Sequence, residues 1–186
     1  MLATRKEPRE SKPCVFSKKG KIMSLTTLES VLNHALKDLL SAEKQFRDAL
    51  PKLSEAAANR ELASALLEHR DETVHHIERL ERCFELLGKS PRSEKCEAAE
   101  GLVEEGKSII EEGGEGPSFD VAIVGAARKV EHYEIVSYAD ACEYAKNLGH
   151  QELENVLRET LQEEQVTDSK LHKLGERLVM EAKRSA

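Results

Sequence analysis

The chain has 186 residues, of which 34% are charged and 4% aromatic, and its formal net charge at pH 7 is −7. This length predicts a single domain that can bury a large core without disulfides. The negative charge argues against a nucleic-acid partner. The longest apolar run, residues 121–127, is far too short to cross a bilayer, which argues against a membrane partner.

The first 22 residues differ in composition from the rest of the chain. They hold seven Lys or Arg residues against two Glu, together with Pro and Gly. Such a segment buries too little apolar surface to fold, so we expect a basic, disordered tail over residues 1–22. Lys and Ser interrupt every apolar run in it, which excludes a secretory signal. We expect the folded domain to span residues 23–186.

The next part of the chain predicts two long helices. Apolar residues recur at helical spacing after a cap at Ser24 or Thr27, and Pro51 marks the end of this helix or a kink in it. A second helix is predicted from just after Asn59 to Gly88, a residue type that commonly follows a helix end.

The second half of the chain predicts three more helices. A shorter helix over about residues 94–111 lies within a long connection, and long helices follow over about residues 118–148 and 151–182. The pattern predicts an all-α fold, a ferritin-like four-helix bundle with a long, partly helical connection between helices two and three. Such a connection allows the second and third long helices to run parallel.

The four cysteines are Cys14, Cys83, Cys96 and Cys142. They form no CxxC pair and no Cys/His spacing typical of zinc. We expect reduced, mostly buried thiols and a cytoplasmic protein.

Acidic side chains fall on the apolar face of every long helix when residues are projected at about 100° each. In chain order these acids are Glu43, Glu72, Glu131, Glu134, Glu164 and Asp168. On the second helix His69 and His76 lie close to the same face, whereas His75 points away from it.

Buried ionised carboxylates cost several kcal/mol each unless they are paired. No inward Lys or Arg is available to match all of these acids, and divalent cations would supply the missing charge. Carboxylate oxygens with imidazole nitrogens suit iron or manganese. Acids that converge from four helices are typical of di-metal carboxylate bundles, so we expect two iron or manganese ions per chain.

Four stretches carry a resemblance to a known family: DLLSAEKQFRDALPKL, ERLERCFELLGKSPRSEKCEAAEGL, KVEHYEIVSYADA and LRETLQEEQVTDSKL. They resemble the YciE/YciF ferritin-like family, and the match covers about residues 24–182. The resemblance implies a rubrerythrin-like bundle, an association with stress responses and a homodimer. The biochemical activity of that family is poorly defined.

The resemblance also implies a ligand set that matches the six acids residue by residue. Glu131 and Glu134 correspond to the E-x-x-E pair of helix three. One departure concerns helix two, where His76 stands at a position that is usually Gln in the family and His75 replaces a small residue. Rubrerythrin-like sites use a His on helix two, so His76 becomes a candidate ligand. Which of His69, His75 and His76 binds metal stays open.

The leading hypothesis is a di-metal redox enzyme that acts on peroxide or dioxygen. No cysteine-rich electron-transfer domain is present, so a redox cycle would need an external electron donor or would disproportionate peroxide. Tyr138, one turn past Glu134, is the candidate catalytic residue. It could relay an electron or hydrogen-bond a ligand, and we favour the hydrogen bond. The alternatives are a non-enzymatic metal-binding or stress protein and a helical interaction module with protonated or hydrated acids.

Overall fold

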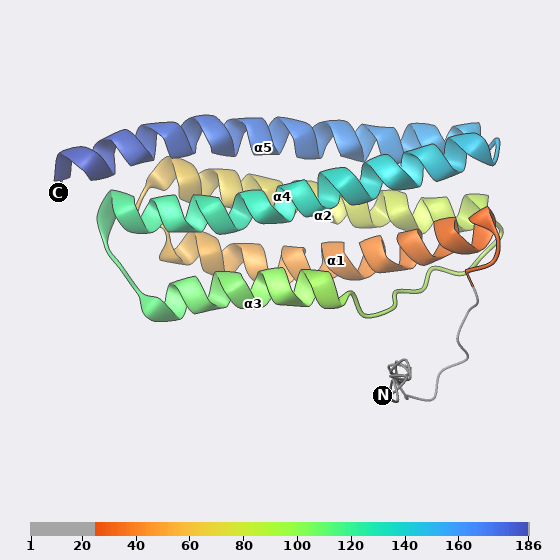
Figure 1. Ribbon diagram of the computed structural model, residues 1–186, viewed down its shortest axis with the longest axis horizontal. Helices are drawn as coiled ribbons and strands as arrows, with labels where there is room; N and C mark the ends of the chain where they lie inside the picture. Colours follow the sequence, from red (N-terminus) through yellow and green to blue (C-terminus); the bar gives the residue numbers. More distant parts are fainter. Residues whose placement is uncertain (1–24, 186) are drawn as a thin grey trace, which may run out of the picture.

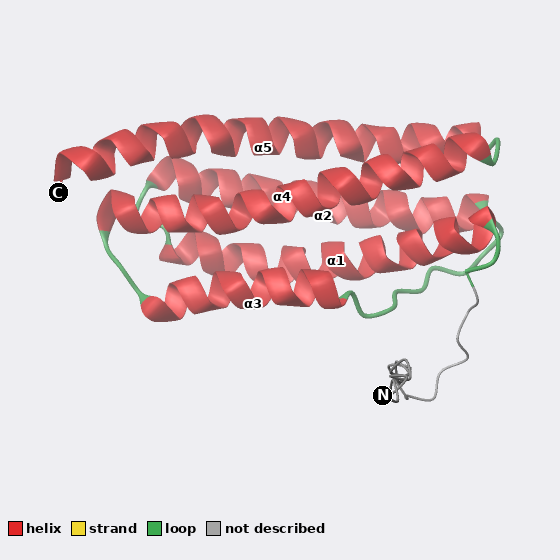
Figure 2. Cartoon of the chain, in the orientation of Figure 1, coloured by secondary structure: helices red, strands yellow, loops and turns green. Residues whose placement is uncertain are grey.

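The computed structural model describes residues 25–185, and these residues form five helices and no strand (Figure 2). The expected disordered tail, the domain start at residue 23, the alternative cap Ser24 and the thiol of Cys14 lie outside the described residues.

The first helix, α1 (Leu28–Ala56), is capped by Thr27 as expected. The hydroxyl of Thr27 accepts a hydrogen bond from the Ser30 backbone N–H, and the Ser30 hydroxyl accepts one from the Thr27 N–H, each at 3.2 Å. This reciprocal pair satisfies two of the backbone donors that a helix start leaves free. Pro51 lies inside the helix, near its end.

The second helix, α2 (Arg60–Leu86), begins where the sequence predicts. The side chain of Asn59 accepts a hydrogen bond from the Leu62 N–H at 3.0 Å. A carboxylate oxygen of Asp120, on the fourth helix, accepts from the Asn59 N–H at 3.0 Å and ties the start of α2 to that helix. Gly88 follows the helix end with a φ of 65°, which a glycine adopts without strain.

The remaining helices are α3 (Glu97–Glu112), α4 (Gly116–Asn147) and α5 (Gln151–Ser185). As Figure 1 shows, α3 carries the chain back along the bundle, so that α2 and α4 run in the same direction, as the long connection allowed. Helix α1 packs against α2 and α4, and α5 packs against the same two helices, while α3 covers the edge between α1 and α4. This is the expected four-helix bundle, with α3 as its partly helical connection.

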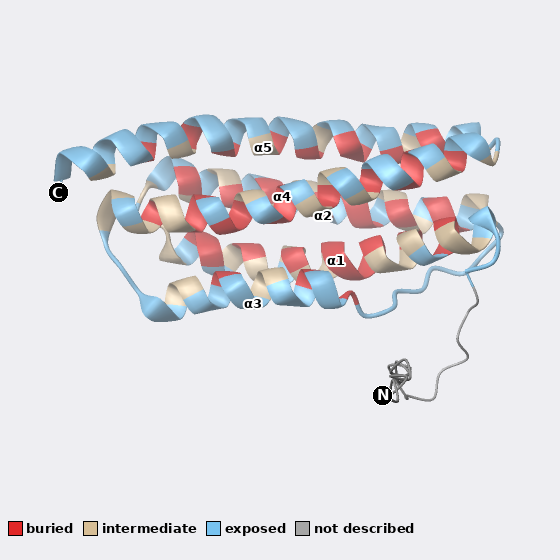
Figure 3. Cartoon of the chain, viewed as in Figure 1, coloured by how far each residue is buried: buried red, intermediate tan, exposed pale blue. Residues whose placement is uncertain are grey.

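Besides a small cluster around Phe46 and Ala99 beside α3, the core consists of two larger apolar clusters at opposite ends of the bundle. One contains Leu36, Leu80 and Tyr138, and the other contains Leu62, Ile123 and Leu174. In Figure 3 buried residues run along the inward faces of all four long helices. Between the two clusters, each long helix contributes at least one buried polar residue.

Two further expectations concern the thiols and the membrane. Cys83, Cys96 and Cys142 are buried and unpaired. Within residues 25–185, no helix has both the length and the apolar character that a membrane span requires.

Candidate metal centre

The polar layer between the two apolar clusters is built from all four long helices. Its members are Glu43 of α1, His69 and His76 of α2, Glu131 and Glu134 of α4, and Glu164 of α5. None of these side chains is more than 2% exposed. Each lies on the same face as its helix's apolar residues, so the packing that buries the leucines also buries these groups.

One group of potential ligands contains His69, Glu131, Glu134 and Glu164. Each offers a nitrogen or oxygen atom, and these atoms all lie within 4.8 Å of one another. Nε2 of His69 lies 3.2 Å from Oε1 of Glu131 and 3.8 Å from Oε2 of Glu164. Spacings this short place several donor atoms around one small volume.

A second group contains Glu43, His76 and Glu164, again with donor atoms within 4.8 Å of one another. Nδ1 of His76 lies 2.9 Å from Oε1 of Glu164 and 3.6 Å from Oε2 of Glu43. Glu164 belongs to both groups, so its two oxygens can serve two neighbouring ions.

Each histidine presents one nitrogen to the core and the other to an acid at its outer side. Nδ1 of His69 lies 3.6 Å from Oε2 of Glu72, and Nε2 of His76 lies 2.9 Å from Oε2 of Glu163. Arg79 holds Glu163 through a hydrogen bond of 3.0 Å to Oε1. Carboxylates behind a histidine fix the ring orientation and raise its basicity, as is common for metal-binding imidazoles.

Tyr138 supports the second group in the same way. Its buried hydroxyl donates a short hydrogen bond to Oε1 of Glu43, which leaves Oε2 of Glu43 free to face His76.

Many polar atoms of this layer lack a hydrogen-bond partner. They are Oε2 of Glu43, both ring nitrogens of His69, Nδ1 of His76, Oε2 of Glu131, and both carboxylate oxygens of Glu134 and of Glu164. The short approach of His76 to Glu164 lacks the alignment of a hydrogen bond. Each unsatisfied buried group costs about 1–3 kcal/mol. A cluster of unpaired oxygens and imidazole nitrogens fits the coordination preferences of iron and manganese.

The environment perturbs the acids strongly. Burial raises the pKa of Glu131 and of Glu134 well above the ordinary glutamate value, and the nearby Glu164 raises both further. Burial also raises the pKa of Glu43, although His76 opposes the shift. These carboxyls therefore hold protons in the metal-free core at pH values where exposed glutamates are ionised.

The pKa values of the two histidines are raised, which favours the charged form of each ring. Burial lowers the pKa of His69, but the facing carboxylates of Glu131 and Glu72 outweigh it and raise the pKa to about 9. Burial likewise lowers the pKa of His76, but the facing carboxylates of Glu164 and Glu43 outweigh it and raise the pKa to about 11. The acids and histidines of the metal-free layer therefore share more protons than the same groups would hold in water, and a cation would have to displace them.

The structure brings together Glu43, His76, Glu131, Glu134 and Glu164 of the residues proposed from sequence. Two acids lie outside both groups: the side chain of Glu72 is 38% exposed and that of Asp168 is 18% exposed. Arg128 contacts both oxygens of Asp168, at 2.7 and 3.3 Å. A ligand role for Glu72 or Asp168 stays a prediction.

Sequence reasoning left the histidines open and missed Glu163. His69 and His76 face the layer, whereas His75 is 67% exposed beside Glu78. The positions of His69 and His76 near the apolar face of the predicted helix were enough to indicate that both point into the core. Glu163 approaches His76 across the α2–α5 interface, a contact that projecting each helix alone cannot reveal.

Comparisons with known proteins agree with the fold of the chain. Residues 27–183 match the family model described as Domain of unknown function (DUF892). Over 154 residues the chain is 42% identical to Protein YciF of Escherichia coli (strain K12), covering 82% of this chain and 93% of that protein.

Two solved structures resemble the bundle over most of its length. The crystal structure of the E. coli stress protein YciF matches with a TM-score of 0.81 and 41% identity, covering 83% of this chain and 98% of that one. YcfI from Rhodopseudomonas palustris matches with a TM-score of 0.79 and 38% identity, covering 81% and 96%.

Proposed function

This chain belongs to the DUF892 family, and we propose that it is a di-metal carboxylate protein of the stress-response type that reacts with peroxide or dioxygen. The proposal rests on one observation above all. The buried polar layer contains many potential ligand atoms without a hydrogen-bond partner, and they fall into two groups that share Glu164.

Two iron or manganese ions per chain would account for both groups. His69, Glu131, Glu134 and Glu164 would hold one ion, and Glu43, His76 and Glu164 would hold the other. A pair of such ions, when bound, supplies electrons and Lewis acidity next to each other.

The side chains around the ions would perform the remaining tasks. Tyr138 orients Glu43 through its hydroxyl proton, and Glu163 orients His76. The apolar clusters on either side exclude bulk water. In this proposal Tyr138 is a positioning residue for Glu43 rather than an electron relay.

The setting of this chemistry is also part of the proposal. The relative YciF is described as a stress protein. A redox cycle in this chain would draw electrons from an external donor, and we propose a homodimer that works in the cytoplasm.

Metal analysis tests the proposal directly. Protein loaded with ferrous or manganous ion should contain about two ions per chain. Glu164→Gln should lose metal from both groups, whereas Glu143→Gln, which changes an exposed acid of α4, should retain it. A metal content near zero in the loaded wild type would eliminate the proposal.

A second measurement separates an enzyme from a non-enzymatic metal protein. Loaded wild type should consume peroxide faster than the same concentration of free metal, and Glu164→Gln should not. Loaded protein that binds two ions yet leaves peroxide untouched would favour the non-enzymatic alternative.

A further inference from the structure

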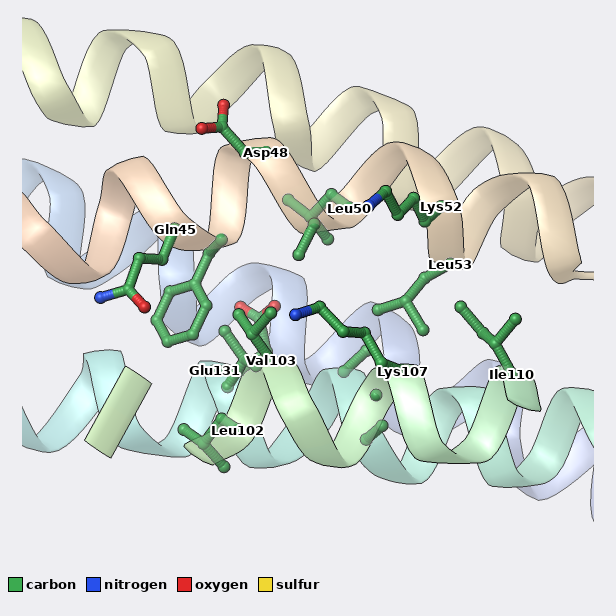
Figure 4. Close-up of a pocket in the computed structure, with 16 residues that line it drawn as sticks. Gln45, Asp48, Leu50, Lys52, Leu53, Leu102, Val103, Lys107, Ile110 and Glu131 are labelled. Carbon is green, nitrogen blue, oxygen red and sulfur yellow. The ribbon is translucent and has the colours of Figure 1, made fainter. Parts of the chain in front are cut away.

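A cavity of about 270 Å³ lies between α1, α3 and α4, beside the metal centre. We call it the α1–α3 cavity. In Figure 4, Leu50 and Leu53 of α1 face Val103 and Ile110 of α3 across this space. Its volume is just below the roughly 300–1,000 Å³ range of pockets that take drug-sized ligands, so only a small molecule fits.

The buried part of the cavity wall is apolar except at one place. Its buried walls include Phe46, Leu50, Leu53 and Val130, and Glu131 is the charged exception. Glu131 is 1% exposed, and its Oε2 has no hydrogen-bond partner. The cavity therefore reaches a residue of the proposed metal centre, and this inference rests on the proposed function to that extent.

The mouth of the cavity carries two lysines, Lys52 and Lys107, and one acid, Asp48. The carboxylate of Asp48 points away from the space between α1 and α3 in Figure 4, and Arg47 pairs with it at 2.8 Å. Lys107 contacts Glu104 at 3.2 Å in an exposed ion pair, which solvent weakens. The mouth therefore presents positive charge to an entering molecule.

We propose that the α1–α3 cavity binds a small carboxylic acid with an apolar chain. The carboxylate pairs with Lys52 and Lys107 at the mouth, and the chain lies among the leucines with its end against Glu131. The opposite orientation would place the ligand carboxylate in the apolar interior against Glu131, where burying a second acid group is costly. The ligand thus brings its apolar end, rather than its acid group, to the metal centre.

Binding of three matched probes tests the chemical class of the ligand. Octanoate, octan-1-ol and octylammonium share one chain length and differ only in the charge of the head group. Titration calorimetry on the full chain should rank octanoate first and octylammonium last. Replacing Lys52 and Lys107 together by Gln should weaken octanoate by about threefold or more and leave octanol unchanged, because only the acid pairs with the lysines. Octanol that binds as tightly as octanoate would overturn the proposal.

Two glycines of α3 provide a matched test of the location. A Cβ on Gly106 would lie 3.6 Å from Leu53 at the cavity wall, whereas a Cβ on Gly101 would meet no atom within 4 Å. Gly106→Leu fills the cavity and should weaken octanoate by about tenfold or more. Gly101→Leu makes the same change in helix propensity on the exposed side and should leave binding unchanged. Equal affinity in the two variants would show that octanoate binds elsewhere.

Gly106→Leu could fail to fold, so a milder variant at the same position is also needed. Metal content then separates the ligand site from the metal centre. Gly106→Ala makes only ordinary contacts with Leu53, so it should fold and weaken octanoate to a smaller degree. Two ions per chain with no octanoate binding would refute the ligand site alone. The protein could instead take up no metal and still bind octanoate, with weaker binding in Gly106→Leu than in Gly101→Leu. That result would support the cavity and refute the metal centre.

Discussion

The hydroxyl of Tyr138 donates a hydrogen bond to Oε1 of Glu43, from α4 to α1 across the buried centre of the bundle. The two residues lie 95 positions apart in the sequence. The bond fixes which oxygen of Glu43 remains free to face His76, so a side chain outside both ligand groups sets the geometry of one of them.

Tyr138→Phe removes this hydrogen bond and keeps the ring. Because partners behind a ligand typically contribute 10–100-fold to metal affinity, we expect an affinity loss of about tenfold or more, confined to one of the two ions. Competition with a chelator of known affinity measures it. Tyr144→Phe, on the same helix but outside the polar layer, is the control. An unchanged affinity for both ions would leave only a packing role for Tyr138.

Glu131→Leu tests whether the buried acids destabilise the metal-free protein. The variant removes a buried acid whose ionisation burial opposes, so the metal-free protein should melt at a higher temperature than metal-free wild type. Wild type should gain about 2.7 kcal/mol when free metal is 100 times the dissociation constant, and several degrees in melting temperature. Glu131→Leu should lose most of that gain.

Scanning calorimetry with and without metal compares the two proteins. Glu143→Leu, on the exposed side of α4, controls for the added leucine. If metal leaves the wild-type melting temperature unchanged and Glu131→Leu melts below the metal-free wild type, the acids are structural.

His76→Gln tests the departure of α2 from the family pattern. His76 is buried with Nδ1 toward Glu164, and Gln offers only a weakly coordinating amide in its place. We expect weaker ferrous binding, by about tenfold or more. Parallel titrations of His75→Gln should match wild type, because His75 is 67% exposed. Identical titrations for all three proteins would make His76 a bystander.

The pH dependence of stability follows from the raised pKa values. The pKa of Glu131 is raised by burial and that of His69 is raised to about 9, so the folded metal-free protein binds more protons than the unfolded chain above about pH 4.5. These two residues therefore make the free energy of unfolding fall as pH rises from about 4.5 toward 9. Glu131→Leu removes one of these groups and the main charge facing the other.

Urea unfolding in the presence of a chelator, at about pH 5, 7 and 9, measures this dependence. The stability advantage of Glu131→Leu over wild type should increase at each step. An advantage that is constant or shrinks with pH would contradict the raised pKa values of both Glu131 and His69.

The helices could be predicted from sequence because their signals are local. Thr27 caps the first helix and the second helix begins just after Asn59, both as expected, and the inward faces follow from apolar periodicity. The projection of each helix also placed four acids on its inward face and so identified them as candidates for the buried layer: Glu43, Glu131, Glu134 and Glu164.

Whether inward residues meet depends on contacts between helices, which a single helix cannot show. Asp168 shares a helical face with Glu164, but its carboxylate pairs with Arg128 of α4 and belongs to neither group. Glu163 lies beside Glu164 and touches His76 instead. The α1–α3 cavity was equally hidden, because it is a space between three helices that the pattern of one helix cannot show.

The connection through α3 has a consequence for how the chain assembles. It separates the chain into two antiparallel hairpins, α1 with α2 and α4 with α5, each formed by residues close in sequence. Both ligand groups draw residues from both hairpins. In one of them, the α1–α2 hairpin supplies Glu43 and His76, and the α4–α5 hairpin supplies Glu164. Neither hairpin can build a complete group on its own. Metal uptake during refolding would therefore report the docking of the two hairpins, a later event than helix formation.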